Sequence, residues 1–198
     1  RMDPDVPLVV PEVNNEDLKS IKKKIIANPN CSTIQLVVAL NPIHQFNQLK
    51  RVIVDTYQSV SGAGASGVQE LQQQTNAFVQ GEKVERNIMP YQIAFNVIPE
   101  IDSLLDNGYF NEEWKMIQET KKIMHAPQLD ISATAVRVPV YIGHSEAVHL
   151  ELSSPMDAQE VRELLAVAPG VQLLDNPSKS LYPVPVSYTH LTLPTNRE

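Results

Sequence analysis

The order of helical and strand-like patterns is the feature that most restricts the fold of this chain. Strand-like runs are expected at residues 50–57, 91–98, 132–142, 147–152 and 171–174. Helical spacing of apolar residues is expected in segments at residues 16–27, 34–40, 66–79, 111–124 and 157–168. A doubly wound parallel sheet needs strands and helices to alternate regularly, and here they do not. The pattern therefore predicts an α+β domain, in which helices cover one mixed or antiparallel sheet.

The overall composition excludes several classes of partner. With 198 residues, the chain can form one sizeable core, or one domain and pieces of another. It contains no apolar run of the roughly 20 residues that a membrane-spanning helix needs, and acidic residues and prolines in residues 1–5 rule out a signal peptide there. A net charge of −7 disfavours nucleic acid. We therefore expect neither a nucleic-acid nor a membrane partner.

The first expected helix contains the strongest cluster of basic residues. Asn14 and Asn15 are possible N-caps, and the apolar residues that follow at helical spacing are Leu18, Ile21, Ile25 and Ile26. The basic run at residues 22–24 is then interpreted as a solvated helix face and not as a nucleic-acid site. Residues 28–30 (NPN) are expected to end this helix.

The single cysteine is the first candidate for chemistry. Because Cys31 is alone, it forms no internal disulfide, and the sequence does not call for an oxidising compartment. It follows a proline turn at the expected start of a helix, where free amides and the helix dipole stabilise a thiolate. Taken alone, the residues leave two interpretations: a nucleophile, or an inert buried cysteine.

Four residues near one expected strand could suggest a metal site: His144, Glu146, His149 and Glu151. Alternation along a strand would place the two histidines on opposite faces. Their spacing matches no usual zinc site. No metal is therefore expected.

The last residues are not expected to belong to the natural protein. Residues 187–195 (SYTHLTLPT) resemble the translated adapter of a sequencing library, and the resemblance begins at Val186. Residues 186–198 are therefore excluded from fold arguments. This also removes His190 from the candidate site residues.

Residues 28–35 (NPNCSTIQ) resemble the nucleophile motif of bacterial aspartate-semialdehyde dehydrogenases. Further motifs of that family follow in the same order along the chain. They are residues 10–14 (VPEVN), 56–64 (TYQSVSGAG), 112–116 (EEWKM), 119–123 (ETKKI), 137–140 (RVPV) and 143–145 (GHS). The fold that this resemblance implies is a C-terminal catalytic domain like that of glyceraldehyde-3-phosphate dehydrogenase.

The resemblance implies a reductive dephosphorylation. L-4-aspartyl phosphate would become L-aspartate 4-semialdehyde, with NADPH as reductant and release of inorganic phosphate, in the pathway to lysine, threonine, methionine and diaminopimelate. Cys31 would form a thioester, His144 would act as acid and base, and Gln58 would position the acyl group. The family is homodimeric and cytoplasmic.

The resemblance also implies how substrate and cofactor are bound. Arg137 would hold the substrate's α-carboxylate through two parallel hydrogen bonds. Glu113 would contact its ammonium group, while Lys115 and Asn30 would lie near the phosphate. Two further residues would let NADP(H) approach the backbone, Ser61 and Gly62. One departure from the family is visible, because residues 65–67 (ASG) stand where relatives often have a basic residue.

The domain boundaries follow from the same comparison. Residues 1–14 are expected to end a nucleotide-binding domain, residues 15–175 to form the catalytic and dimerisation domain, and residues 176–185 to begin the return to the nucleotide-binding domain. The chain has no G-x-G-x-x-G fingerprint. The Rossmann domain that binds most of NADP(H), together with its phosphate-binding basic residue, is therefore expected to be missing.

Two alternative functions are left open. The chain could be a truncated dimerisation fragment without activity of its own. It could also belong to N-acetyl-γ-glutamyl-phosphate reductase, a related enzyme with similar chemistry. The motifs that contain Glu113, Lys115, Arg137 and His144 favour the aspartyl enzyme.

Overall fold

The computed structural model describes residues 1–185, so the adapter interpretation of residues 186–198 lies outside the described residues. The chain divides into two compact units. We call Arg1–Thr56, Pro99–Val136 and Glu146–Leu174 the sheet unit. The helix–loop unit consists of Tyr57–Ile98, Arg137–Ser145 and the residues from Asp175 onward.

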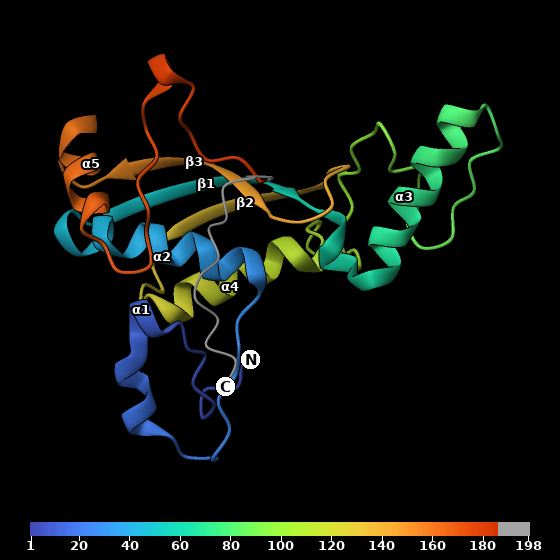
Figure 1. Cartoon of the computed structure of the whole chain (residues 1–198). Coiled ribbons are helices and arrows are strands. Elements are labelled where there is room, and N and C mark those ends of the chain that lie inside the picture. The colour runs from blue at the N-terminus through green and yellow to red at the C-terminus, as the bar shows by residue number, and fades with distance from the viewer. Residues whose placement is uncertain (186–198) are drawn as a thin grey trace, which may run out of the picture. The chain divides into compact units, whose positions relative to one another are not determined.

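The sheet has three strands, β1 (Leu49–Gln58), β2 (Asp130–Arg137) and β3 (Ser145–Leu152), with β1 between the other two (Figure 1). Buried and more exposed positions alternate along β2 and along much of β1, as a pleated strand with one covered face requires. Val52 and Val54 of β1 are completely buried. The strands expected in these three regions are confirmed.

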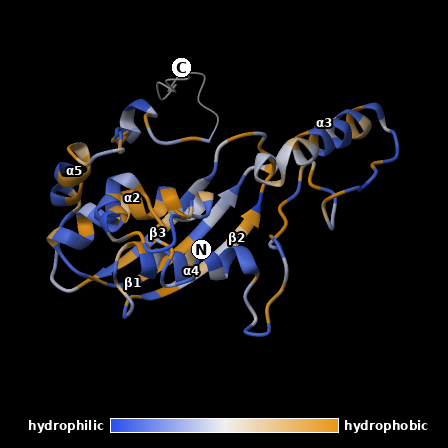
Figure 2. Cartoon of the chain, turned by 90° about the horizontal axis from the view of Figure 1, so that it is seen from below, coloured by the Kyte–Doolittle hydropathy of each residue, from blue (hydrophilic) through white to orange (hydrophobic). Residues whose placement is uncertain are grey.

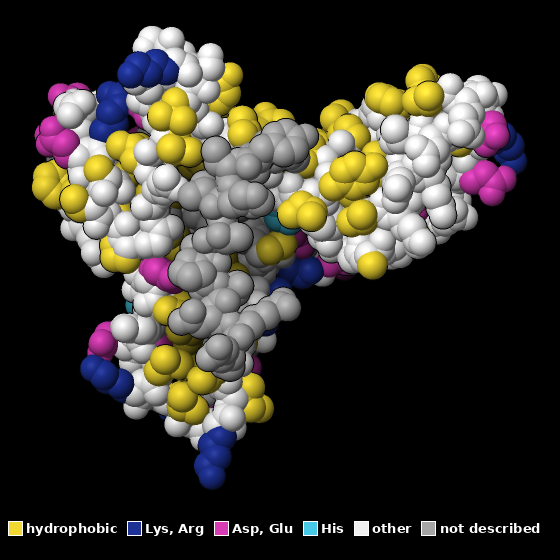
Figure 3. All heavy atoms as spheres, viewed as in Figure 1, with side chains coloured by type: hydrophobic (Ala, Val, Ile, Leu, Met, Phe, Trp, Pro, Cys, Tyr) yellow, Lys and Arg dark blue, Asp and Glu magenta, His cyan; other side chains and the backbone are white. Residues whose placement is uncertain are grey.

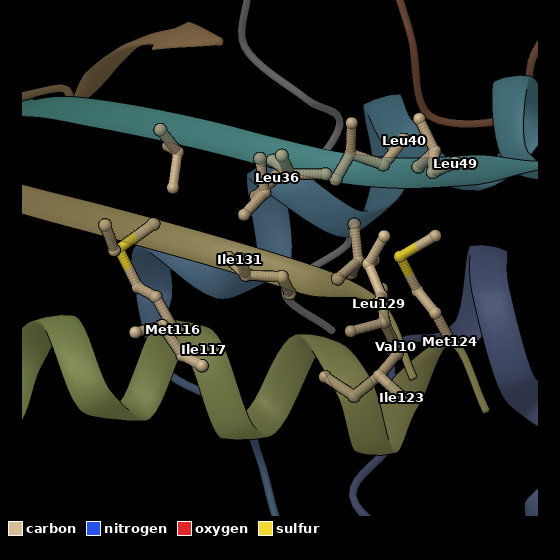
Figure 4. Packing of buried hydrophobic residues seen from close by; sticks show 14 of the residues in the cluster. Val10, Leu36, Leu40, Leu49, Met116, Ile117, Ile123, Met124, Leu129 and Ile131 are labelled. Carbon is tan, nitrogen blue, oxygen red and sulfur yellow. The ribbon is translucent and has the colours of Figure 1, made fainter. Parts of the chain in front are cut away.

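Two helices, α2 (Cys31–Phe46) and α4 (Asn111–Ile123), lie on the same side of this sheet (Figure 1). Leu36 of α2, Ile131 of β2 and Met116 of α4 belong to the main hydrophobic core, and Figure 4 shows the side chains of this cluster directed toward one another. A further helix, α5 (Ala158–Ala166), contacts α2. The strands and helices of this unit have both hydrophobic and hydrophilic residues, in keeping with one covered and one exposed side (Figure 2). The predicted α+β class is confirmed.

The helix α2 is longer than expected. It continues through Pro42, although proline cannot donate the backbone hydrogen bond of a helix interior. Leu40 and Ile43, on either side of Pro42, are both buried in the main core. Burial on this face therefore outweighs the local preference for a helix end.

The helix expected across residues 16–27 is wrong. The structure has a short α1 (Pro11–Asn14) and a 3-10 helix η1 (Asn15–Ser20), after which the chain is irregular up to Asn30. The N–H of Ala27 donates to the carbonyl of Pro7 at 2.9 Å, and the N–H of Val9 donates to the carbonyl of Ala27 at 3.2 Å. A residue whose backbone bonds to a distant segment in this way cannot continue a helix.

In the helix–loop unit, the turn η2 (Val60–Ala63) leads into α3 (Gly64–Gln80), which confirms the helix expected there. Gly81 ends α3 with a positive φ of 71°, a conformation that glycine adopts without strain. Figure 3 shows hydrophobic side chains on the surface over this unit. The exposed hydrophobic residues of this unit include Phe78, Tyr91, Phe95 and Val97.

The strand expected at residues 91–98 is wrong. Ile93, Ala94 and Ile98 are instead buried in a small second core, without a strand ladder. The N–H groups of Ile93 and Ala94 donate to the side-chain oxygen of Gln74, at 2.8 and 3.1 Å. Only Ile98 forms a bridge, to Arg137. A side-chain amide from α3 thus satisfies donors that would otherwise need a neighbouring strand.

Two smaller expectations also differ from the structure. β2 ends at Arg137 and not at residue 142, because Pro139 has no N–H to donate to a ladder. Residues 171–174 form no strand. None of the helices in residues 1–185 is long and apolar enough to cross a membrane. The last described helix is a 3-10 turn, η3 (Pro177–Lys179).

Candidate active site

Cys31 is the first residue of α2, as expected, and it is exposed. Asn30 caps this helix, because its side-chain oxygen accepts hydrogen bonds from the N–H groups of Ser32 at 3.0 Å and Thr33 at 3.2 Å. The carbonyl of Asn30 also accepts the N–H of Ile34 at 3.0 Å. The direction of Cys31 therefore depends on how Asn30 is held.

Two carboxylates of α4 hold Asn30. Its backbone N–H donates to Oε2 of Glu119 at 2.6 Å, and its side-chain Nδ2 donates to Oε1 of Glu112 at 2.8 Å. Glu112 and Glu119 are seven residues apart, so they lie on the same face of the helix. Both are buried, and their hydrogen bonds to Asn30 explain this, because carboxylates are rarely buried without a partner.

Lys115 lies one turn after Glu112. Its Nζ is 2.6 Å from Oδ2 of Asp102 and 3.6 Å from Oε2 of Glu112. Burial acts to lower the pKa of Lys115, but the hydrogen bond to Asp102 and the charge of Glu112 outweigh burial, and the pKa is raised overall. The hydrogen bond from Lys115 in turn lowers the pKa of Asp102. Lys115 is therefore a cation at neutral pH.

Glu113, which the sequence placed at the substrate's ammonium group, is turned into the protein. Its Oε1 accepts the N–H of Ala135 at 2.9 Å, and its Oε2 accepts the N–H of Phe110 at 2.8 Å. Both oxygens thus bond to the backbone of the sheet unit. Glu112, and not Glu113, adjoins Asn30 and Lys115.

In the helix–loop unit, the backbone of one residue holds two candidates. The N–H of Ser59 donates to Nδ1 of His144 at 3.0 Å, and the carbonyl of Ser59 accepts from NH1 of Arg137 at 2.8 Å. Because Nδ1 accepts this bond, the neutral ring of His144 carries its proton on Nε2. Gln58, the residue before Ser59, is buried at the end of β1.

The candidate cofactor residues lie in the same loop. The hydroxyl of Ser61 is 2.9 Å from that of Ser59. A Cβ atom added to Gly62 would lie 2.7 Å from NH1 of Arg137 and 3.4 Å from Cε1 of His144. The absence of a side chain at Gly62 therefore leaves room for these two residues, in addition to any approach by a cofactor.

Three residues around Asn30 were not among the candidates from the sequence: Arg1, Glu112 and Glu119. NH1 of Arg1 lies 3.3 Å from Oε1 of Glu119, so a basic side chain is present beside the carboxylate that holds Asn30. Arg1 is not the phosphate-binding basic residue that the resemblance implies, which is expected in the nucleotide-binding domain, outside this chain. The spacing of seven between Glu112 and Glu119 was the available signal, since charged residues two turns apart share a helix face.

Within residues 1–185, no group of three or more His, Cys, Asp or Glu side chains is arranged to hold a metal ion.

Comparison with known proteins identifies the family. The profile of the semialdehyde dehydrogenase dimerisation domain matches residues 40–196. The chain belongs to the semialdehyde dehydrogenase family. It is 54% identical to aspartate-semialdehyde dehydrogenase of Aquifex aeolicus over 188 residues, and 54% identical to that of Bacillus subtilis over 193 residues. These matches cover 94% and 93% of this chain but only 55% and 56% of the relatives, so the chain spans about half their length.

Solved structures of the family agree with this assignment. Aspartate-semialdehyde dehydrogenase II from Vibrio cholerae, complexed with ASA, has a TM-score of 0.84 at 50% identity and covers 85% of this chain and 51% of its own. The Candida albicans enzyme with NADP has a TM-score of 0.58 at 27% identity, over 83% of this chain and 45% of its own. The resemblance to aspartate-semialdehyde dehydrogenases that the motifs indicated is therefore confirmed.

Proposed function

We propose that this chain supplies the catalytic residues for the NADPH-dependent reductive dephosphorylation of L-4-aspartyl phosphate to L-aspartate 4-semialdehyde. The observation that carries the proposal is an exposed, single cysteine at the first position of a capped helix. The relatives named above, about half identical to this chain, support the choice of reaction. The pathway would be the cytoplasmic synthesis of lysine, threonine, methionine and diaminopimelate.

The first step uses Cys31. Its thiolate attacks the carbonyl carbon of the acyl phosphate, the bond from that carbon to the phosphate oxygen breaks, and inorganic phosphate leaves. The product is a thioester on Cys31, which divides one difficult displacement into two easier steps.

The second step reduces the thioester. NADPH, when bound, supplies the two electrons as hydride. The carbon–sulfur bond to Cys31 then breaks and the aldehyde is released. His144 holds a proton on Nε2, as the bond from Ser59 to Nδ1 requires, and it donates that proton to the departing thiolate of Cys31. We assign Gln58 the positioning of the acyl group. We assign the contact with the ring end of the nucleotide to the hydroxyl of Ser61 and to the backbone of Gly62, while the main binding domain is expected outside this chain.

The substrate's charged groups require complementary charges. Arg137 is anchored through NH1, and its planar guanidinium suits the α-carboxylate. Lys115 and Asn30 would bind the phosphate end. For the ammonium group we propose Glu112 in place of Glu113, because Glu112 adjoins Asn30 and Lys115, whereas Glu113 is turned toward the backbone of the sheet unit.

The assembly that we propose is a homodimer. The matching family profile describes a dimerisation domain, and the helix–loop unit has exposed hydrophobic side chains. Because the chain spans about half of its relatives, residues 1–185 alone are expected to show no turnover. Sedimentation of the purified chain tests the dimer, and NADPH oxidation tests the inactivity.

The reaction is tested in the longer protein that contains this chain. NADPH oxidation is followed with L-4-aspartyl phosphate and with N-acetyl-γ-glutamyl phosphate. We expect a preference for the aspartyl substrate, and a fall of at least about a thousandfold in Cys31→Ser, as removal of a nucleophile gives. A preference for the acetylated glutamyl substrate would contradict the proposal in favour of the reductase.

A further inference from the structure

We propose that Glu119 is a positioning residue for the nucleophile: it fixes the backbone of Asn30 and thereby the first turn of α2, on which Cys31 lies. Glu119 is only 2% exposed, and its Oε2 accepts the N–H of Asn30 at 2.6 Å. This inference rests on the proposed role of Cys31, but it concerns a residue that touches neither the thiol nor, as proposed, the substrate.

Asn30 is the point through which this effect passes. It accepts three N–H groups from the first turn of α2, two on its side chain and one on its carbonyl. Its two donors face α4, with the backbone N–H on Glu119 and the side-chain amide on Glu112. The capping bonds at the start of α2 therefore meet at Asn30, and two side chains of α4 hold this residue.

The two carboxylates hold different parts of Asn30. Glu112 fixes the side-chain amide of Asn30 with its oxygen toward the helix, because the nitrogen is held by Oε1 of Glu112. Glu119 fixes the backbone one residue before Cys31, where a small rotation moves the thiol most directly. Its Oε1 binds Arg1 in addition, so one carboxylate connects the chain's first residue to the nucleophile turn.

The test uses the thiol itself. Cys31 is the only cysteine in the sequence, so its alkylation by iodoacetamide can be followed directly by mass spectrometry. Glu119→Met keeps the length of the side chain but cannot accept the bond, whereas Glu119→Gln removes the charge and keeps one accepting oxygen. We expect alkylation in Glu119→Met to slow by about three- to fivefold, the factor that loss of one helix cap corresponds to. In Glu119→Gln we expect a rate within about twofold of the wild type.

The control is Glu163→Met, on the exposed face of α5, where Glu163 also accepts one side-chain bond, from Gln159. Its alkylation rate should not change. Equal effects of Met and Gln at position 119 would show that charge and not the bond matters, and would overturn the proposal. So would an unchanged or faster rate in Glu119→Met.

If Glu119→Met does not fold, hydrogen exchange of the wild-type protein still tests the bond from Asn30 to Glu119. Hydrogen exchange at the N–H of Asn30 should then be slow, as for a buried bonded amide. Exchange as fast as in an open loop would overturn the proposal. Failure of the proposed function is distinguishable, because a protein with a clamped, reactive Cys31 and no turnover contradicts only the reaction.

Discussion

The two groups of candidate residues are held in different ways. In the sheet unit, Asn30 is held by the side chains of Glu112 and Glu119. In the helix–loop unit, Arg137 and His144 are held by the backbone of Ser59. A hydrogen bond from a side chain is lost by a single substitution of that residue. A hydrogen bond from the backbone survives most substitutions of the residue that provides it. The residues around Asn30 should therefore be sensitive to side-chain substitutions, and those around Ser59 to changes of the backbone.

The largest expected effect concerns pH and another acidic residue of the sheet unit, Glu146. One of its oxygens is buried, with no hydrogen-bond partner among the described residues, and burial raises its pKa to about 7 despite a hydrogen bond from Gln35. The folded protein therefore binds this proton more tightly than the unfolded chain does. Stability from this group is full below the unfolded pKa near 4.5 and is lost as pH rises to about 7.

We expect Glu146→Gln to remove this loss. Its free energy of unfolding should exceed that of the wild type by up to about 3 kcal/mol at pH 8, because a shift of one pKa unit corresponds to about 1.4 kcal/mol. The two proteins should be similar near pH 4. Urea unfolding at both pH values measures the difference. A constant difference across this range would show that Glu146 does not titrate as described.

The second prediction concerns the hydrogen bond from the backbone N–H of Ser59 to His144. Ser59 has a φ of −65°, which proline adopts without strain, so Ser59→Pro removes the N–H that bonds to His144 while allowing the local conformation. Loss of the defined proton position on His144 should lower turnover on the order of a hundredfold, within the range for acid–base catalysis. Steady-state kinetics of the longer protein measures it.

The matched control is Ser59→Ala. It removes the hydroxyl, which lies 3.2 Å from Nδ1 of His144, but it keeps both backbone groups. Turnover should change by less than about fivefold, since a side-chain bond of this kind contributes about 1 kcal/mol or less. Equal losses in both variants would mean that the hydroxyl, and not the backbone, positions the histidine.

The smallest effect is expected at the helix cap. Asn30→Ala removes the cap of α2 and leaves Glu112 without the donor on Asn30, so the free energy of unfolding should fall by about 2 kcal/mol. Asn47, at the other end of the same helix, provides the comparison, because its bonds to Ser154 are exposed. Asn47→Ala should cost less than about 1 kcal/mol in the same urea titration. A larger loss of unfolding free energy at Asn47 than at Asn30 would contradict the importance of the bonds between Asn30 and α4.

Local patterns predicted the elements whose own residues decide their structure. α4 has an apolar stripe, a favourable charge distribution and buried Met116 and Ile117, and it formed as expected. The strand β1 did so as well. Residues 16–27 and 91–98 have similar apolar patterns but no such structure, because Pro7 and Gln74 provide distant bonding groups that no local pattern contains.

The sequence alone was enough to determine the family and the start of α2, since the motifs and the proline turn before Cys31 are made of adjacent residues. The roles of Glu112, Glu113 and Ser59 were decided only by the tertiary structure. Glu112 and Glu113 are neighbours of one type, and about 100° of helix rotation sends one toward Asn30 and the other toward β2. Ser59 acts through backbone atoms that every residue has. Position in the folded chain, and not residue type, therefore determines what these residues hold.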